Sequence, residues 1–213
     1  MPSRPGEGPG RQRAPVPRPG GGIHWHRSLL RKGPGPLQPS HLVYRHRRGG
    51  GDVLYCLVLD CSASMLRSGR LSLAKGLLSG WLGQIYRQRA QVAVVGFSGR
   101  EAWVIQTPAR AGVANDHWIA PIPGGGGTPM GQGLVLADRM MARFRRRVDH
   151  AHIGVWLLTD GRVRGVPPPP RQADFCTVVD FETGRARSGG ALRIARAWDA
   201  SLCPASDFFD DPH

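Results

Sequence analysis

The sequence is poor in acidic residues, in paired cysteines and in long apolar segments. Only 15 Asp and Glu residues stand against 29 Lys and Arg residues, so the formal net charge is +14. No apolar segment approaches the roughly 20 residues that cross a bilayer, and the first residues lack the apolar core of a signal peptide. The four cysteines form no C-x-x-C pair, which favours free thiols in a reducing compartment. We therefore expect a cytoplasmic protein that makes no contact with a membrane.

The excess of positive charge lies in the first 50 residues. These residues include ten basic residues and one acidic residue, Glu7. The rest of the chain holds 19 basic and 14 acidic residues. Residues 1–22 are mostly Pro, Gly and Arg with little to bury, so we expect them to be disordered. We predict a basic tail and lead-in at 1–50, a folded domain at 51–205 and a frayed end at 206–213. A basic tail with aromatic residues can bind nucleic acid, but no nucleic-acid-binding fold accompanies it, so we expect no such partner.

Apolar runs of strand length alternate with helical patterns along residues 51–205. Four runs predict buried strands, at 53–59, 91–97, 153–159 and 173–179. Apolar residues recur at helical spacing in three stretches, which predicts helices at 71–85, 130–148 and 191–198. Residues 102–105 favour an antiparallel edge strand, and 108–120 favour a short helix. This order of elements predicts an α/β fold, a doubly wound and mostly parallel sheet with helices on both faces and one antiparallel edge strand.

Oxygen-bearing side chains follow the first strand at alternate positions, namely Asp60, Ser62 and Ser64. Asp160 follows the strand at 153–159, and because parallel strands deliver their carboxyl ends to one sheet edge, it should emerge beside Asp60. Thr128 follows four glycines that are flexible enough to bring its hydroxyl close. Oxygen donors with no Cys–His pair nearby select a hard cation, so we expect Mg²⁺, with Mn²⁺ or Ca²⁺ as alternatives. The simpler interpretation is that Asp60 starts a turn and Ser64 caps the next helix.

Other chemical motifs in the chain are incomplete. Gly96-Phe97-Ser98-Gly99 lacks the last glycine of a nucleophile elbow, because Arg100 stands at that position. The glycines before the helix at 130–148 are not followed by the lysine of a phosphate-binding loop. His150 and His152 have no third ligand in view, so we expect them to be structural or solvated. Five arginines lie on or just after the exposed side of the helix predicted at 130–148. We predict that they form a solvated face, with binding of an acidic partner as the alternative. These are Arg139, Arg143, Arg145, Arg146 and Arg147.

The three segments that carry the oxygen donors resemble the von Willebrand factor A family, also called the integrin I domain. Its metal-ion-dependent adhesion site combines D-x-S-x-S, a downstream Thr and a downstream Asp in this order. The resemblance implies that two carboxylates hold the ion directly or through water and that three hydroxyls contact it: Asp60, Asp160, Ser62, Ser64 and Thr128. It also implies that a carboxylate of a partner protein completes the coordination. One departure is Ala63, where many members have Gly; we expect a slightly stiffer turn and an intact site.

Within this family, the chain looks like the carboxyl-terminal domain of the D subunit of magnesium chelatase and its cobalt-chelatase relatives. The similarity lies in segments 57–65, 124–129, 157–161, 178–184 and 192–195, with a similar lead-in at 23–25 and 42–45. It implies a non-catalytic accessory subunit of a complex that inserts a metal into a tetrapyrrole. The implied partners are a separate AAA-type ATPase and a large chelatase subunit. The ATPase-like domain and acidic linker that normally precede this domain are absent here, so we expect a stand-alone module.

Two other functions stay open on the sequence. The module could instead serve a MoxR-type ATPase in the maturation of other metalloenzymes. An independent Mg²⁺-dependent phosphoryl-transfer enzyme would need an aspartyl nucleophile or a second metal beside Asp60. Phosphatases of the haloacid-dehalogenase type have a second Asp where this chain has Ser62, which argues against that function.

Overall fold

The computed structural model describes residues 53–110, 112, 116–182 and 188–208, and its strands form one sheet. The predicted tail and lead-in at 1–50 therefore lies outside the described residues. In chain order, the strands are β1 (Val53–Asp60), β2 (Gln91–Ser98), β3 (Glu101–Arg110), β4 (His152–Thr159), β5 (Phe175–Asp180) and β6 (Ser201–Pro204). Their order across the sheet is β3-β2-β1-β4-β5-β6.

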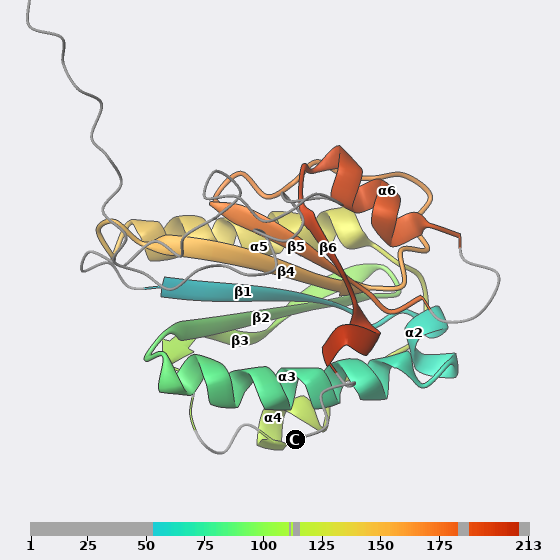
Figure 1. Ribbon diagram of the computed structural model, residues 1–213, viewed down its shortest axis with the longest axis horizontal. Helices are drawn as coiled ribbons and strands as arrows, with labels where there is room; N and C mark the ends of the chain where they lie inside the picture. Colours follow the sequence, from blue (N-terminus) through green and yellow to red (C-terminus); the bar gives the residue numbers. More distant parts are fainter. Residues whose placement is uncertain (1–52, 111, 113–115, 183–187, 209–213) are drawn as a thin grey trace, which may run out of the picture. The chain divides into compact units, whose positions relative to one another are not determined.

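Helices cover both faces of this sheet (Figure 1). They are α2 (Ala63–Arg67), α3 (Arg70–Arg87), α4 (Asp116–Ile119), α5 (Met130–Arg145) and α6 (Gly190–Ala197), followed by a 3-10 helix (Ala205–Phe208). α3 and α4 lie on one face, and α5 and α6 lie on the other. Buried residues of α3 recur three and four positions apart, as Leu71, Ala74 and Leu78 do, so one side of the helix packs on the sheet. None of the helices in this part of the chain is long and apolar enough to cross a bilayer.

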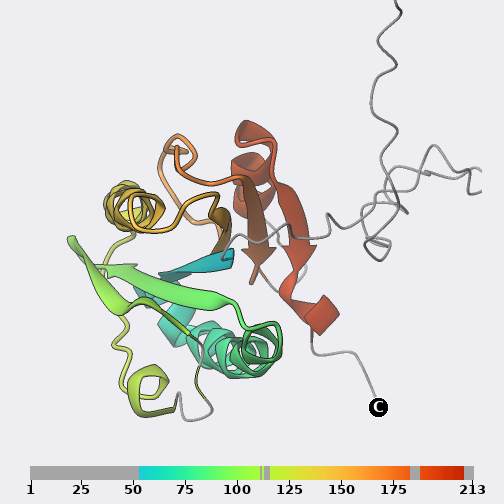
Figure 2. The ribbon, with the colours of Figure 1, turned by 90° about the vertical axis from the view of Figure 1, so that its left-hand side faces the viewer.

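β1 lies in the middle of the sheet and runs parallel to its neighbours β2 and β4. β5 and β6 continue the sheet in parallel, whereas β3 pairs antiparallel with β2 at the edge (Figure 2). This is the doubly wound, mostly parallel α/β fold that the sequence predicts, including its antiparallel edge strand. Because the parallel strands point the same way, the loops after β1, β2, β4 and β5 meet at one edge of the sheet.

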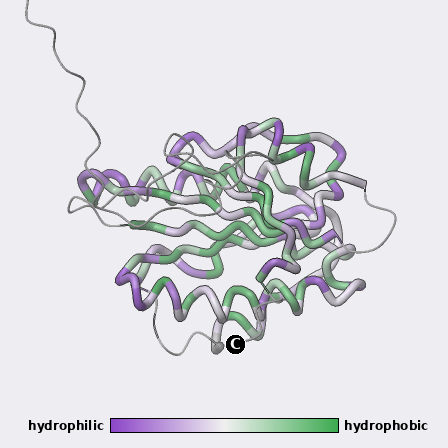
Figure 3. The backbone as a smooth tube through the Cα atoms, viewed as in Figure 1, coloured by the Kyte–Doolittle hydropathy of each residue, from purple (hydrophilic) through white to green (hydrophobic). Residues whose placement is uncertain are grey.

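The apolar side chains of the sheet divide between two cores. On one face, Leu57 of β1 belongs to the same buried cluster as Leu78 of α3. On the other face, Cys56 and Val58 belong to a cluster with residues of α5 and α6. Successive residues of a strand point to opposite faces, so a strand covered on both sides is apolar throughout, as the central strands in Figure 3 are. This packing fixes the position of the last residue of β1, Asp60.

The edge strand is longer than predicted, and the helix after it is shorter. We predicted a strand at 102–105 and a helix at 108–120, whereas β3 runs to Arg110 and α4 covers only Asp116–Ile119. Pro108 lies within β3, where it is tolerated because an edge strand has one side without ladder partners. Register shifts against β2 also mark an irregularity in the pairing. The proline and the irregular pairing therefore made the second half of this strand hard to predict from the sequence.

The carboxyl-terminal segment differs from our prediction of a frayed end at 206–213. β6 and the 3-10 helix continue the described chain to Phe208. The ring centroid of Phe208 lies 5.1 Å from that of Trp81 and 6.4 Å from that of Trp156. Edge-to-face aromatic contacts of this kind contribute stability beyond the burial of area. The prediction is therefore corrected for residues 206–208, and 209–213 lie outside the described residues.

One arginine of α5 is structural rather than solvated. Arg145 donates hydrogen bonds to the carbonyl oxygens of Ala151 and Gln172, each at 2.9 Å, and pairs with Asp174 at 2.7 Å. Asp174 also accepts the backbone N–H of Ile153 at 2.6 Å, so these contacts join the end of α5 to the starts of β4 and β5. The other four arginines of the predicted solvated face are exposed. Their exposure fits both the solvated face and the alternative of an acidic partner, so both stay open for these four, whereas the prediction is wrong for Arg145.

Candidate metal-binding site

Two neighbouring strands deliver acidic residues to the same edge of the sheet. β1 ends at Asp60, and Asp160 directly follows β4. Both residues are completely buried. Because β1 pairs with β4 in a register that sets Leu59 opposite Leu158, the two carboxylates emerge close together. The structure thus places Asp160 beside Asp60, as the strand ends predict, while metal binding by the pair stays a prediction.

Both oxygens of the Asp60 carboxylate accept hydrogen bonds. The backbone N–H of Ser62 donates to Oδ1 at 2.9 Å, and the hydroxyl of Thr159 donates to Oδ2 at 2.7 Å. Burial raises the pKa of Asp60 above its ordinary value; the hydrogen bonds from Ser62 and Thr159 work in the opposite direction, and the nearby charge of Asp160 adds to the rise. Burial therefore disfavours the ionised form of this carboxylate, and a cation bound beside it would offset that cost.

The hydroxyls of Ser62 and Ser64 lie 3.1 Å apart at the start of α2. Ser62 is the cap residue of this helix, but its side chain makes no capping hydrogen bond. Ser64 lies inside α2, so the alternative that Ser64 only caps the helix is wrong. Ser62 is buried and Ser64 is half-buried. Neither hydroxyl is therefore committed to capping, and both can serve a ligand at this turn.

Backbone hydrogen bonds join the run of four glycines to the same turn. The N–H of Gly125 donates to the carbonyl of Cys61 at 2.8 Å, and the N–H of Ala63 donates to the carbonyl of Gly126 at 3.0 Å. Thr128 is half-buried and follows Gly126 by two residues. The loop that carries Thr128 is thus attached to the turn that carries the two serines, although more than 60 residues separate them in sequence. That the Thr128 hydroxyl joins the serines at one ligand stays a prediction.

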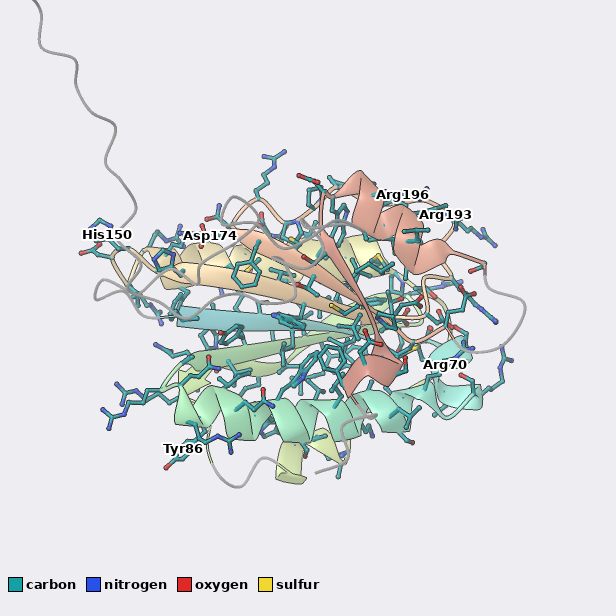
Figure 4. The ribbon with its side chains drawn as sticks, in the orientation of Figure 1. Arg70, Tyr86, His150, Asp174, Arg193 and Arg196 are labelled. Carbon is teal, nitrogen blue, oxygen red and sulfur yellow. The ribbon has the colours of Figure 1, made fainter. Side chains whose placement is uncertain are left out.

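Two arginines hold Asp160. Nη1 of Arg70 donates to Oδ2 at 3.1 Å, the backbone N–H of Arg162 donates to Oδ1 at 3.2 Å, and Nε of Arg162 lies 3.8 Å from Oδ2. The side chain of Arg70 is 7% exposed and that of Arg162 is 55% exposed, so Arg70 is the buried partner. Figure 4 shows Arg70 beside α2, at the opposite end of the sheet from His150. His150 and His152 are exposed and take no part in this group.

The backbone after Asp160 packs directly against the start of α6. Gly161 has a φ of +71°, in the left-handed region that favours glycine. A Cβ on Gly161 would overlap the backbone nitrogen of Ala191, and a Cβ on Gly190 would overlap the carbonyl oxygen of Gly161. Two glycines therefore allow the main chains to touch, and this contact fixes the segment that carries Asp160.

Gly190→Ala is expected to lower the free energy of unfolding by about 2–3 kcal/mol, because the added methyl group meets main-chain atoms of Gly161 that have little freedom to move. Gly80→Ala is the matched control. Gly80 is an exposed residue of α3 with nothing within 4 Å of its Cβ position, so alanine should stabilise the helix by about 0.5–1 kcal/mol. Urea unfolding measures both differences. Effects of the same sign and size would contradict the close contact of Gly161 with Gly190.

Glu182 fixes the residues that lead into α6. Its carboxylate accepts the backbone N–H of Ser188 at 2.7 Å and that of Gly189 at 3.0 Å. Burial would raise the pKa of Glu182, but the hydrogen bonds from Ser188 and Gly189, together with the charge of Arg162, outweigh it and hold the pKa below its ordinary value. Glu182 is therefore ionised and lies in the field of Arg162.

Sequence reasoning missed two residues of the site, Thr159 and Arg70. Thr159 donates to Asp60, and its only sequence signal is its place between an apolar strand and Asp160. Arg70 is one of 29 basic residues, and it meets a carboxylate 90 positions away in the chain. Local pattern gave no reason to select it, because the contact arises from the tertiary fold.

The chemistry of the site fits a hard divalent cation. Carboxylates and hydroxyls are oxygen donors of the kind that Mg²⁺ prefers. Cys61 lies in the same turn, but burial, with the nearby charge of Asp60, raises the pKa of its thiol to about 12, and the thiol donates to the carbonyl of Leu59. A protonated thiol is a poor metal ligand, so Cys61 is left out of the candidate ligands. In the described part of the chain, no three His, Cys, Asp or Glu residues gather into one group, so a metal site at this edge depends on the hydroxyls.

The fold is that of a von Willebrand factor A-like domain, a mostly parallel sheet with one antiparallel edge strand and helices on both faces. A solved von Willebrand factor type A protein from Catenulispora acidiphila matches 74% of this chain and 41% of its own, with a TM-score of 0.50 and 19% sequence identity. At that identity, the likeness shows the fold alone. No protein-family model matches the sequence.

The chain is related in sequence to magnesium-chelatase subunits, in agreement with the resemblance to the D subunit. It is 37% identical over 126 residues to the magnesium-chelatase 60 kDa subunit of Cereibacter sphaeroides. It is 31% identical over 170 residues to the magnesium-chelatase 60 kDa subunit of Rhodobacter capsulatus. These matches cover 59% and 79% of this chain but only 22% and 28% of the relatives, so the chain spans about a quarter of their length.

Proposed function

We propose that this chain is a Mg²⁺-dependent protein-interaction module and an accessory subunit of a chelatase-like complex that inserts a metal into a tetrapyrrole. The supporting observation is that oxygen-bearing side chains from two strand ends meet at one sheet edge, where the loop that carries Thr128 is hydrogen-bonded to the same turn. The relatives of the chain are named magnesium-chelatase subunits. The residues that would hold the ion are Asp60, Ser62, Ser64, Thr128 and Asp160. Mg²⁺ bound there would supply an open coordination position for an oxygen ligand from outside the chain.

The hydroxyls and the carboxylates have different parts in this proposal. Ser62, Ser64 and Thr128 offer neutral oxygens, which leave the charge of the ion largely uncompensated. Asp60 and Asp160 already accept hydrogen bonds from the protein on both oxygens, so they would hold the ion through their second lone pairs or through water. In this proposal, a carboxylate from a partner protein would take the open coordination position. The site thus binds a protein and carries out no reaction of its own.

The partners in this proposal are a separate AAA-type ATPase and a large chelatase subunit in the cytoplasm. The chain would couple ATP hydrolysis by one partner to metal insertion by the other. A MoxR-type ATPase that matures other metalloenzymes is the second candidate, because it would use the same adhesion-type site. Neither candidate requires a nucleic acid or a membrane.

The proposal is tested by capture of partners from the lysate of the source cell. With Mg²⁺, the tagged full chain should retain an AAA-type ATPase together with a large chelatase subunit. EDTA, Ser62→Ala or Thr128→Ala should reduce the recovery at least about tenfold, because each removes the ion or one of its oxygens. Ser72→Ala changes an exposed serine of α3 and should behave as the wild type.

The two candidate complexes give different results. Recovery of an ATPase without a chelatase subunit, still dependent on Mg²⁺, would favour the MoxR-type alternative. Recovery that changes with neither the metal nor the variants would contradict an adhesion-type function altogether.

A further inference from the structure

A buried arginine lies inside the candidate metal site. Arg70 is the first residue of α3, and its side chain is 7% exposed and pairs with the completely buried Asp160 at 3.1 Å. A positive charge at the amino end of a helix opposes the helix dipole, and the guanidinium has also lost most of its hydration. Buried ion pairs of this kind are weak contributors to stability compared with apolar residues of similar size. Stability therefore does not account for an arginine here.

The ionisable groups of the site give it a definite formal charge. Asp60 and Asp160 are the buried carboxylates among the candidate ligands, and Arg70 pairs with Asp160. Glu182 is also buried, and Asp180 ends β5 at the same edge. Arg162 also lies near Asp160, but Glu182 balances it, as the lowered pKa of Glu182 reflects. Counted for the two candidate carboxylate ligands and Arg70 alone, with the carboxylates ionised, the formal charge is minus one. A divalent cation would turn this into one positive charge, and a single carboxylate from outside would neutralise it.

Without Arg70, the formal charge of the candidate ligands is minus two. Two uncompensated carboxylates would bind a divalent cation more strongly, and the loaded site would then be neutral. A neutral set of charges attracts an anionic ligand less strongly than a positive one. The charge of Arg70 therefore acts in opposite directions on the two binding steps, since it repels the cation and attracts the carboxylate that follows. Solvent screens this effect little, because Arg70 and Asp160 are buried.

We propose that Arg70 is a specificity-determining residue that weakens binding of the cation alone and makes the loaded site select a singly charged carboxylate. This inference rests on the proposed function, because it concerns the same metal site. It assigns to the arginine a role beyond the support of Asp160, and it explains why a costly buried cation lies at a cation-binding site.

Three exposed arginines add further positive charge at this edge of the sheet. Arg67 ends α2, Arg100 lies in the turn after β2, and Arg164 lies in the loop after β4, so all three belong to loops that meet at this edge. The partner chemistry that fits is an acidic segment, with one carboxylate at the site and further acids near these arginines. Such an arrangement speeds encounter and favours acidic partners.

Calorimetric titration of the full chain with Mn²⁺, with and without excess acetate as the carboxylate probe, tests the inference. Arg70→Gln should bind Mn²⁺ alone about tenfold more tightly than the wild type, because a repelling charge is gone. The factor by which acetate strengthens Mn²⁺ binding should fall towards one in the same variant. Arg70→Lys keeps the charge and should restore both values. Arg87→Gln, at the other end of α3 and about 25 Å away, should change neither.

The outcomes separate the possible failures. If Arg70→Gln weakens Mn²⁺ binding, or leaves the acetate factor unchanged, the inference is overturned and Arg70 is only a support for Asp160. If the wild type binds no Mn²⁺, the proposed function fails instead. Should circular dichroism show that Arg70→Gln does not fold, Arg162→Gln provides the test, because that side chain is exposed and lies 3.8 Å from Asp160. It should shift both values about two- to threefold in the same directions, and no shift would overturn the inference.

Discussion

Asp60→Asn is expected to abolish the stabilisation of the protein by Mg²⁺. A metal that binds only the folded state at a concentration of a hundred times its Kd stabilises that state by about 2.7 kcal/mol. For a domain of this size, that corresponds to a rise in Tm of roughly 5–10 °C. The amide lacks the negative charge on which cation binding depends, so differential scanning calorimetry should show this rise in the wild type and none in the variant.

The same substitution should leave the metal-free protein at least as stable as the wild type. Burial disfavours the ionised carboxylate of Asp60, as the rise of its pKa shows, so at neutral pH the charge costs stability that a neutral side chain does not. The amide oxygen can accept the N–H of Ser62, and the amide nitrogen can donate to the hydroxyl of Thr159. In EDTA, the Tm should therefore equal or exceed that of the wild type by a few degrees.

The control for this pair of measurements is Asp149→Asn, which changes an exposed aspartate. It should leave both the Tm in EDTA and the response to Mg²⁺ unchanged. A Mg²⁺ response that survives Asp60→Asn would remove Asp60 from the proposed ligands. A large loss of stability in EDTA would mean that the hydrogen bonds of the carboxylate matter more than the cost of its charge.

The central strands were predictable because burial on both faces leaves an unbroken apolar run. β1, β2 and β4 begin and end within one residue of the predicted runs, and the polar residue after each run marks the carboxyl edge. The peripheral strands were harder to see. β6 has only four residues, all half-buried, so neither an apolar run nor an alternating pattern distinguishes it from a loop.

The closeness of the two buried aspartates was predictable for the same reason. Asp60 and Asp160 stand at the ends of adjacent buried strands, so the fold alone brings them together. Their partners depend on contacts that the sequence pattern does not encode. Thr159 meets Asp60 across the pair β1 and β4, and Arg70 reaches Asp160 from the start of α3. Arg70 is therefore recognised as part of the site only in the structure, where α3 packs on the sheet.

The donors of the motif and the charged groups outside it would affect binding in different ways. The donors that the motif names would tolerate several divalent cations, because oxygen ligands discriminate among hard cations mainly by geometry and number. If the site holds a cation as proposed, the groups outside the motif would decide the charge that it presents to a partner. Two chains with identical donors and different residues at the position of Arg70 would therefore differ in the ligand they accept more than in the metal.

Asp160→Ala is expected to be the most destabilising single change in the site, with a loss of about 3–5 kcal/mol in the free energy of unfolding in EDTA. The loss arises because Arg70, 7% exposed, keeps its charge in the interior and no longer has this carboxylate beside it. Urea unfolding at neutral pH measures it. Asp149→Ala, at an exposed position, should change the same quantity by no more than about 0.5 kcal/mol.

The double variant Arg70→Met with Asp160→Ala separates two causes of lost stability. One is the buried charge of Arg70 without the Asp160 carboxylate, and the other is the loss of packing. If the charge dominates, removing both partners should recover about 2 kcal/mol or more relative to Asp160→Ala alone, which a double-mutant cycle reports as strong coupling. Simple additivity of the two single changes would contradict the buried pair, because residues that do not interact show no coupling. Strong coupling in EDTA, together with the opposite effects of Arg70→Gln on Mn²⁺ and acetate, would separate the structural part of this arginine from its effect on ligand choice.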